Sequence, residues 1–432
     1  MTTDVEVKTK TWVVAGLVAA VAAASAGIEP AQNAVAGARA PIDFVRDFTA
    51  ARALGRGDRR YAVDAGRHNV EAALEGAPTV PVHGGPYLPH PPPATVALLP
   101  LAPLSFNAAS TIWLALTLVA LVSLAANLLR AVGPEASEAP HRPSVASVGA
   151  LSAALLLWPP VLHNLEKGQW SILLAAMVAA AWRSAGAGRT GGAGLWIGAA
   201  ASLKVMPATV WPFFMARHRR AAWTALVALA VIIAATLPLT GLSPWLTFVE
   251  QSSANVRALE TWYANTASLH GLFARLFIGG AFARPLVDAP VLGRVLQLIS
   301  NAALLAVAVV VTWRQRRTPP DRPLFALWAT LAVLLNPLAW AHTVVLLALP
   351  FALLFSDDDE SAQRPVLLAA LFLLSIPKET LYRLAGSPPT EGLSGMILSV
   401  HALGALSLFV VAARACYRRS GTDGGGSSAR SD

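Results

Sequence analysis

The sequence predicts an all-α polytopic membrane protein with about twelve transmembrane helices, in a range of roughly 10 to 13. Of its 432 residues, 55% are hydrophobic and only 13% are charged. The mean hydropathy of +0.55 lies outside the range of soluble globular proteins. Apolar runs long enough to cross a hydrocarbon core of about 30 Å recur along the chain. The clearest cover residues 107–129, 221–240, 296–313, 340–355 and 394–413.

The chain before the first of these runs is expected to form one helix and a long loop. Trp12 to Gly27 is apolar and ends in Ala-x-Ala sequences typical of signal peptides, but the many later spans favour a first helix that is retained. Residues 28–95 then form the first extracytoplasmic loop, which carries short amphipathic helices. The Pro-rich segment His90 to Pro93 leads into a partly embedded stretch.

Further along the chain, Gly191 to Met215 lies between two basic loops and is too short for two full crossings at about 1.5 Å per residue. We expect a short broken hairpin there. Residues 1–420 are assigned to a single integral-membrane domain. The Gly/Ser-rich residues 421–432 are assigned to a disordered cytoplasmic tail.

Charge patterning predicts the sidedness of the chain. The net charge of +9 is spread over short loops rather than gathered on one face, which argues against nucleic-acid binding. Short basic loops mark the cytoplasmic side, so a multi-pass plasma-membrane protein with an extracytoplasmic active site is expected. The single Cys416 excludes an intramolecular disulfide and a cysteine-built metal site. The basic segments are Arg130 with Arg142, Arg183 with Arg189, Arg217 to Arg220, Arg314 to Arg322, and Arg414 to Arg419.

Asp43 and Asp47 are the strongest sign of chemistry, because they follow the first span of a chain that is otherwise suited to lipid. A helix over residues 43–56 would place them one turn apart on one face. Arg46 and Arg52 belong to the same segment and offer cations for an anionic lipid headgroup. We interpret the loop as holding a catalytic carboxylate beside lipid-binding arginines. The alternative is a solvated amphipathic face.

Lys204 lies inside the apolar stretch Ile197 to Phe214. An ammonium group at such a depth costs roughly 2.5 to 3.5 kcal/mol to insert, so a phosphate or carboxylate partner is expected. The alternative is a lysine that reaches the interface from the end of a short helix.

Further polar side chains fall at the outer ends of the predicted spans, where they can converge with the first loop on one cavity. No pair has the spacing of a metal site such as His-Glu-x-x-His, and no metal is predicted. The tryptophans at these ends, Trp158, Trp170 and Trp340 among them, are interpreted as an interfacial belt. The candidates are His163, Gln169, Asn265, His270, Asn336 and His342, of which His342 is the strongest.

Several motifs in order resemble glycosyltransferase family 87, the polyprenol-phosphate-sugar-dependent membrane glycosyltransferases of the C-type superfamily. Asp43-Phe44 followed by an Ala-rich helix, Gly57 and Tyr61 is similar to the family's first outer loop. His90 stands where the family often has Tyr before Pro-Pro, and Ala341 interrupts what is often a run of histidines. The other matching segments are Leu98 to Ala102, Gly168-Gln169, Gly194 to Lys204 with Pro207, Asn265 with Ser268 to Gly271, and Asn336 to His342.

The resemblance implies transfer of a sugar, mannose or in some members arabinofuranose, from a polyprenyl phosphate to a glycolipid or glycan acceptor. It implies that Asp43 is the general base and that Asp47 supports or replaces it. Lys204, His342, Arg46 and Arg52 are the expected ligands of the donor phosphate. The remaining candidates, with His90 added, are the expected substrate ligands.

The expected mechanism is a single displacement that inverts the anomeric centre and needs no metal or nucleotide cofactor. Two rival classes suit many of the same features. A secondary transporter or lipid flippase also has many spans and an embedded lysine. A non-catalytic scaffold for envelope assembly would tolerate the loss of Asp43, Lys204 and His342 together.

Overall fold

The computed structural model describes residues 29–39, 41–61, 90–132, 143–258, 266–281, 283–315, 322–386 and 389–422. Within these ranges every regular element is a helix, apart from an isolated bridge between Ala283 and Thr390. The predicted all-α class is therefore confirmed. The predicted first span, Trp12 to Gly27, lies outside the described residues. So does the predicted tail, except for Gly421 and Thr422, which end α21 (Val400–Thr422).

Four described helical segments are long and apolar enough to cross a membrane. They are α6 (Phe106–Ala131), α12 (Arg219–Thr240), α15 (Pro290–Arg314) and Gly392–Arg418, which includes most of α21. The number rises to six if each of two bent helix pairs is one span. The described residues therefore show a membrane protein but do not confirm the predicted count of about twelve spans.

Prolines explain why several apolar stretches form short or bent helices. In the first bent pair, α7 (Val145–Leu156) meets α8 (Pro159–Lys167) at 73°, and prolines occupy the first turn of α8. In the second, α18 (Arg364–Ser375) meets α19 (Lys378–Ala385) at 82°, with Pro377 at the corner. Proline lacks the backbone N–H that a continuing helix needs, so it begins a new helix more readily than it extends one.

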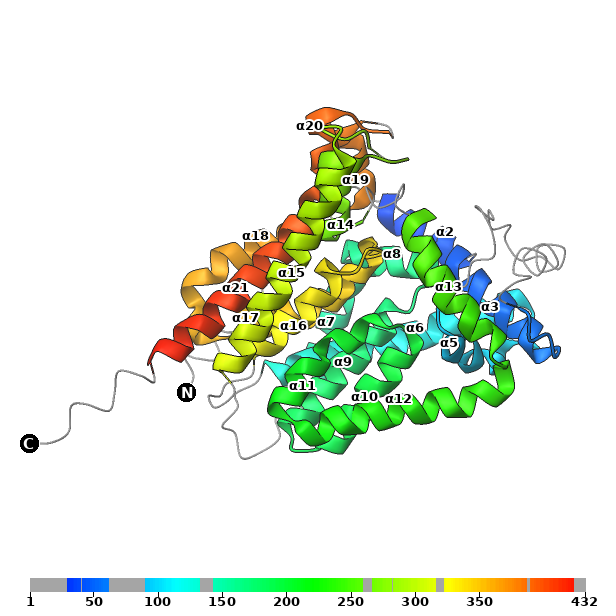
Figure 1. Cartoon of the computed structure of the whole chain (residues 1–432). Coiled ribbons are helices and arrows are strands. Elements are labelled where there is room, and N and C mark those ends of the chain that lie inside the picture. Colours follow the sequence, from blue (N-terminus) through cyan, green and yellow to red (C-terminus); the bar gives the residue numbers. More distant parts are fainter. Residues whose placement is uncertain are drawn as a thin grey trace, which may run out of the picture.

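The remaining helices fill the space between these segments. Figure 1 shows α15, α16 and α21 running beside one another on one side and α9, α10 and α12 together below. The other helices are α2 (Glu29–Arg39), α3 (Ile42–Gly55), α5 (Pro92–Ala97), η1 (Leu99–Leu101), α9 (Ser171–Gly186), α10 (Thr190–Leu203), η2 (Met206–Val210), α11 (Trp211–Arg217), α13 (Ser243–Ala258), α14 (Leu269–Phe273), the π-helix η4 (Ala274–Ile278), α16 (Arg322–Leu334), η5 (Ala341–Leu347), α17 (Ala348–Phe355), η6 (Asp358–Gln363), α20 (Gly392–Gly395) and η7 (Met396–Ser399).

The part of the first loop that the structure describes contains the expected short helices, but α3 is not a solvated surface helix. Phe44, Phe48 and Ala51 are fully buried, and Asp47 is only 2% exposed. The Phe44 ring stacks on Trp113 of α6 with the centroids 5.4 Å apart. The alternative of a solvated amphipathic face is therefore wrong for Asp47, whereas Asp43, Arg46 and Arg52 on the same helix are only half-buried.

Two glycines let α10 approach α12 closely. A Cβ atom at Gly194 would lie 2.4 Å from the backbone oxygen of Ala221, and one at Gly198 would lie 2.5 Å from that of Ala225. Small residues four apart on one helix face allow such backbone contact in membrane proteins. The helix α10 ends at Leu203, and η2 and α11 follow Lys204. Gly191 to Met215 therefore consists of two short helical segments separated at Lys204.

The basic helix ends gather away from the predicted site residues. Arg183, near the end of α9, lies within electrostatic range of Arg130 on α6 and Arg189 before α10. The other end of α9 follows Gln169, and the other end of α10 is Lys204. The two helices thus carry basic residues at one end and predicted site residues at the opposite end, as the positive-inside pattern requires.

Candidate active site

Asp47 is a buried carboxylate with two hydrogen-bond donors. Its Oδ1 lies 2.9 Å from Nδ1 of His90, and its Oδ2 accepts a bond of 2.9 Å from Nε1 of Trp170. His90 and Trp170 are each 2% exposed. Both carboxylate oxygens are therefore engaged inside the protein, and Asp47 joins α3 to the chain before α5 and to the start of α9.

Asp43, one turn earlier on α3, is half-buried and retains an accessible edge. Its Oδ2 accepts a hydrogen bond of 2.8 Å from Nε2 of Gln169. Oε1 of Gln169 is buried and has no protein partner among the described residues. Asp43 is thus the more accessible carboxylate of the pair. Gln169 holds it, and Oε1 of Gln169 remains available to accept a hydrogen bond from a ligand hydroxyl.

Gly168 explains why Gln169 meets α3. It ends α8 in the left-handed region at φ +67°, where side-chain-bearing residues are strained. A Cβ atom there would lie 2.7 Å from Cβ of Pro41 and 2.8 Å from Cβ of Phe44. The Gly168 carbonyl also accepts a 2.9 Å bond from Nε1 of Trp113. Only glycine allows the α8 to α9 corner to sit this close to α3.

Lys204 ends α10 and faces the α3 carboxylates. Asp43 and Asp47 both lie within electrostatic range of its ammonium group, but no hydrogen bond or ion pair holds it among the described residues. The residues after Lys204 are held by Asn336, whose Nδ2 lies 3.3 Å from Sδ of Met206. Oδ1 of Asn336 accepts a bond of 3.0 Å from the Leu338 N–H, which shapes the turn before His342.

His342 is 2% exposed, and neither ring nitrogen has a hydrogen-bond partner in the described part of the chain. Its ring stacks on His163 with the centroids 5.8 Å apart. Lys204 and Lys378 also act on it electrostatically. We call Lys204, His342 and Lys378 the cation cluster. A buried imidazole without a hydrogen-bond partner among the described residues, and within electrostatic range of two ammonium groups, suits an anionic ligand.

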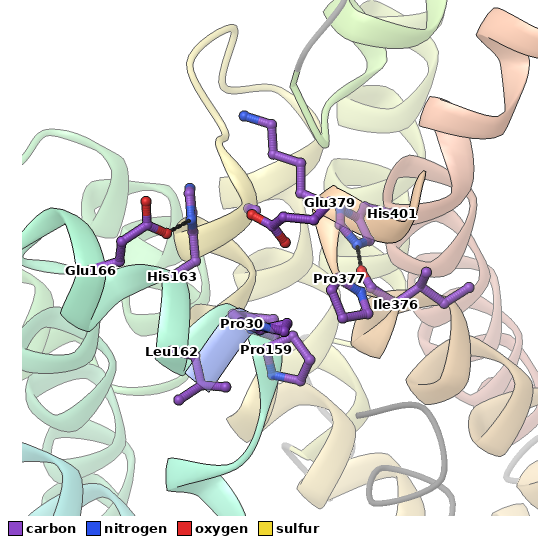
Figure 2. A pocket seen from close by; sticks show the side chains of 12 residues that line it. Pro30, Pro159, Leu162, His163, Glu166, Ile376, Pro377, Glu379 and His401 are labelled. Carbon is purple, nitrogen blue, oxygen red and sulfur yellow. Dashed lines mark hydrogen bonds and ion pairs between the residues drawn. The ribbon is translucent and has the colours of Figure 1, made fainter. Parts of the chain in front are cut away.

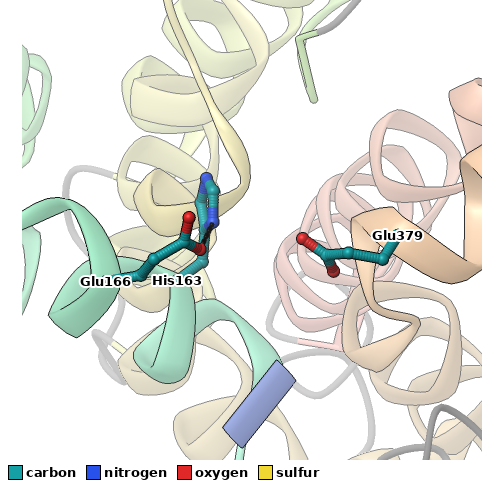
Figure 3. Close-up of side chains that lie close together, drawn as sticks. All are labelled: His163, Glu166 and Glu379. Carbon is teal, nitrogen blue, oxygen red and sulfur yellow. Dashed lines mark hydrogen bonds and ion pairs between the residues drawn. The ribbon is translucent and has the colours of Figure 1, made fainter. Parts of the chain in front are cut away.

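A small cavity, open to solvent, lies between α8 and the corner of α18 and α19. His163 and Glu166 line it from α8, and Glu379 and His401 line it from the opposite side (Figure 2). Nδ1 of His163 lies 3.0 Å from Oε2 of Glu166, whose other oxygen pairs with Nζ of Lys167. The carboxylate of Glu379 points across the gap toward His163 and Glu166 (Figure 3).

Some predicted site residues are not brought into this arrangement by any contact the structure describes. Arg52 stacks its guanidinium over Phe48 at 5.8 Å, and Arg46 lies half-buried on the same helix. His270 lies on α14, which packs against α15, η4, α21 and η7. Asn265 lies outside the described residues. The roles of these four residues stay predictions.

Three features of the site were not anticipated from the sequence. Trp158 and Trp170 are buried and donate to Ser375 and Asp47, so they are not members of an interfacial belt. The segment from His163 to Lys167 is the end of a helix and not part of a loop. Lys378 and Glu379 join the site although neither was singled out. Their signal in the sequence was a Pro-Lys-Glu triplet directly after an apolar run.

Comparison with known proteins places the chain in a family. A relative from Mycolicibacterium smegmatis, the polyprenol-phosphate-mannose-dependent alpha-(1-2)-phosphatidylinositol mannoside mannosyltransferase, is 29% identical over 323 residues, which is 67% of this chain and 68% of the relative. No solved structure matches the chain significantly. The model of glycosyltransferase family 87 matches residues 87–337, more than half of the chain. This range contains Gln169 and Lys204, and the chain therefore belongs to glycosyltransferase family 87.

Proposed function

We propose that this membrane glycosyltransferase moves a mannosyl group from a polyprenyl-phosphate donor to a hydroxyl of a glycolipid or glycan acceptor. The relative's mannose-dependent activity supports the choice of sugar, and arabinofuranose is the alternative donor sugar. The observation that carries the proposal is that the half-buried Asp43 carboxylate lies within electrostatic range of the Lys204 ammonium, which has no ion pair among the described residues. A base and a phosphate-binding cation at one site are what this transfer requires.

On the donor side, the cation cluster binds the phosphate. The departing polyprenyl phosphate carries negative charge that develops as the glycosidic bond breaks, and preorganised cations stabilise that charge. Lys204 and Lys378 supply charge, and the unpartnered nitrogens of His342 supply hydrogen bonds. The isoprenoid tail remains in the bilayer, so the site has to open toward lipid.

On the acceptor side, Asp43 takes the proton of the attacking hydroxyl. The new bond forms between that oxygen and the anomeric carbon, while the bond from this carbon to the phosphate oxygen breaks. A single displacement of this kind inverts the anomeric centre and uses no metal or nucleotide. Asp47 is a positioning residue in this scheme, because its two oxygens already hold His90 and Trp170.

The site is assigned to the extracytoplasmic face of the plasma membrane. Gln169 and Lys204 lie at the ends of α9 and α10 opposite the basic ends, Asp43 accepts a hydrogen bond from Gln169, and short basic loops stay in the cytosol. Accessibility labelling of a cysteine placed at Arg56, which is exposed after α3, tests the assignment in intact cells. Labelling that occurs only in permeabilised cells would place position 56 in the cytosol and contradict the assignment.

The activity is tested by transfer of radiolabel from polyprenyl-phosphate mannose to phosphatidylinositol mannoside in isolated membranes, with no ion gradient applied. We expect labelled glycolipid with the wild-type chain and none with the Asp43→Asn variant. Labelled lipid that crosses the membrane without a new glycosidic bond would instead favour the flippase reading. Parallel assays with polyprenyl-phosphate arabinofuranose decide between the two donor sugars.

A further inference from the structure

The cavity between α8 and α19 has an acidic rim that the transfer chemistry does not use. His163, Glu166 and Glu379 place ligand atoms within 4.8 Å of one another. Glu379 is half-buried, and its carboxylate has no hydrogen bond or ion pair within the described residues. A carboxylate that points into an open cavity without a protein partner keeps its oxygens available to accept hydrogen bonds from a ligand.

We propose that this cavity is the acceptor subsite, in which Glu379 and Glu166 accept hydrogen bonds from the hydroxyls of a neutral sugar residue of the acceptor. The proposal rests on the proposed transfer function. It goes beyond that function by naming the residues that recognise the acceptor and the chemical class that they recognise.

Charge decides which substrate occupies the cavity. The donor carries a phosphate, and its place is at the cation cluster, where Lys204 has no ion pair among the described residues, whereas Lys167 beside the cavity already pairs with Glu166. A sugar residue of the acceptor is uncharged and presents several hydroxyl donors, and each carboxylate oxygen accepts such bonds strongly. The stacking of His163 on His342 places the edge of the cavity directly against the cation cluster. Donor and acceptor would therefore bind at adjoining places, and an in-line transfer requires that the transferred sugar lie between the donor phosphate and the attacking hydroxyl.

The walls of the cavity suit a sugar as well. Pro30, Pro159, Pro160 and Pro377 line it together with Leu162. Rigid apolar side chains of this kind contact the C–H faces of a sugar ring, while a few polar groups set its orientation. Pro159 and Pro160 begin α8 and Pro377 directly precedes α19, so these backbone corners set the positions of the two carboxylates.

A divalent cation is the competing ligand for the same three side chains. The nearby ammonium groups argue against it, because Lys167 already pairs with Glu166 and Lys378 precedes Glu379 in the same turn of α19. Electrostatic attraction also links Lys378 to Glu166 and Glu379. Positive charge is thus supplied by the protein, which lowers the affinity for a metal ion and leaves hydrogen-bond acceptance as the free capacity of the site.

The first test is steady-state kinetics of the Glu379→Gln variant in proteoliposomes with polyprenyl-phosphate mannose and phosphatidylinositol mannoside. The Gln amide lacks the negative charge and keeps only one of the two hydrogen-bond-accepting oxygens, so the KM for the acceptor substrate should rise about tenfold or more, with the KM for the donor unchanged. Glu391→Gln is the matched control, since Glu391 pairs with Arg284 on an exposed surface outside the cavity. An unchanged acceptor KM in Glu379→Gln overturns the inference and leaves the transfer function intact.

A second measurement does not depend on turnover. Saturation-transfer NMR with methyl α-mannoside should show binding to the wild type, to Asp43→Asn and to Glu391→Gln, and much weaker binding to Glu379→Gln. This pattern would support the subsite even if the wild type transferred no sugar. Equal mannoside signals from all four proteins would refute it. A metal site would also refute it. The evidence for one would be a wild-type melting temperature that falls with a chelator and is restored by a divalent cation, with no such response in Glu379→Gln.

Discussion

Replacing Asp43 by Asn separates catalysis from folding, and the structure sets the size of both effects. The side chain is half-buried and makes one hydrogen bond, from Nε2 of Gln169 at 2.8 Å. An amide oxygen can accept the same bond, so the free energy of unfolding should change by no more than about 1 kcal/mol. A positioned base contributes about 10² to 10⁴ in rate, which corresponds to roughly 3 to 5 kcal/mol of transition-state stabilisation.

The assay is mannosyl transfer by purified protein at saturating donor and acceptor, together with a thermal unfolding curve in the same detergent. We expect kcat to fall by about two to four orders of magnitude, with the melting temperature and the KM of the donor unchanged. Asp288→Asn, in an exposed position before α15, is the matched control. A variant that keeps more than about a tenth of wild-type kcat would show that Asp43 is not the base.

Three further substitutions test the surroundings of the site. Asp47→Asn presents an amide N–H₂ to one of its two donors, His90 or Trp170; it should destabilise the protein by about 1 to 3 kcal/mol and lower the melting temperature, whereas an unchanged melting curve would contradict its structural role. Lys204→Met removes a phosphate-binding cation, so we expect the donor KM to rise or turnover to be lost. Unchanged kinetics would favour the alternative, in which Lys204 only reaches the membrane interface. Gly168→Ala forces a side chain into a left-handed, crowded position; unfolding measured in detergent should show a loss of roughly 1 to 3 kcal/mol, and wild-type stability would mean that the corner can shift.

The helical, membrane-embedded character of the chain and its family were predictable from the sequence, which also indicated several candidate site residues. Apolar length alone identifies α6, α12 and α15, because a span needs a fixed number of residues to cross lipid. Asp43, Lys204 and His342 stood out because polar groups are costly near lipid and are retained where they act. Order along the chain also sufficed to suggest glycosyltransferase family 87, which the family match over residues 87–337 confirmed.

Tertiary structure decided how these residues differ from one another. Asp43 and Asp47 are equivalent in the sequence, one turn apart on one helix, yet only Asp47 is closed in by His90 and Trp170. That difference depends on contacts between residues 43 or more positions apart, which no local pattern encodes. The same holds for Glu379, whose place opposite Glu166 follows from the proline corners at α8 and α19. Periodicity and hydropathy report what each segment is suited to contact, whereas the packing of distant segments determines which side chains meet.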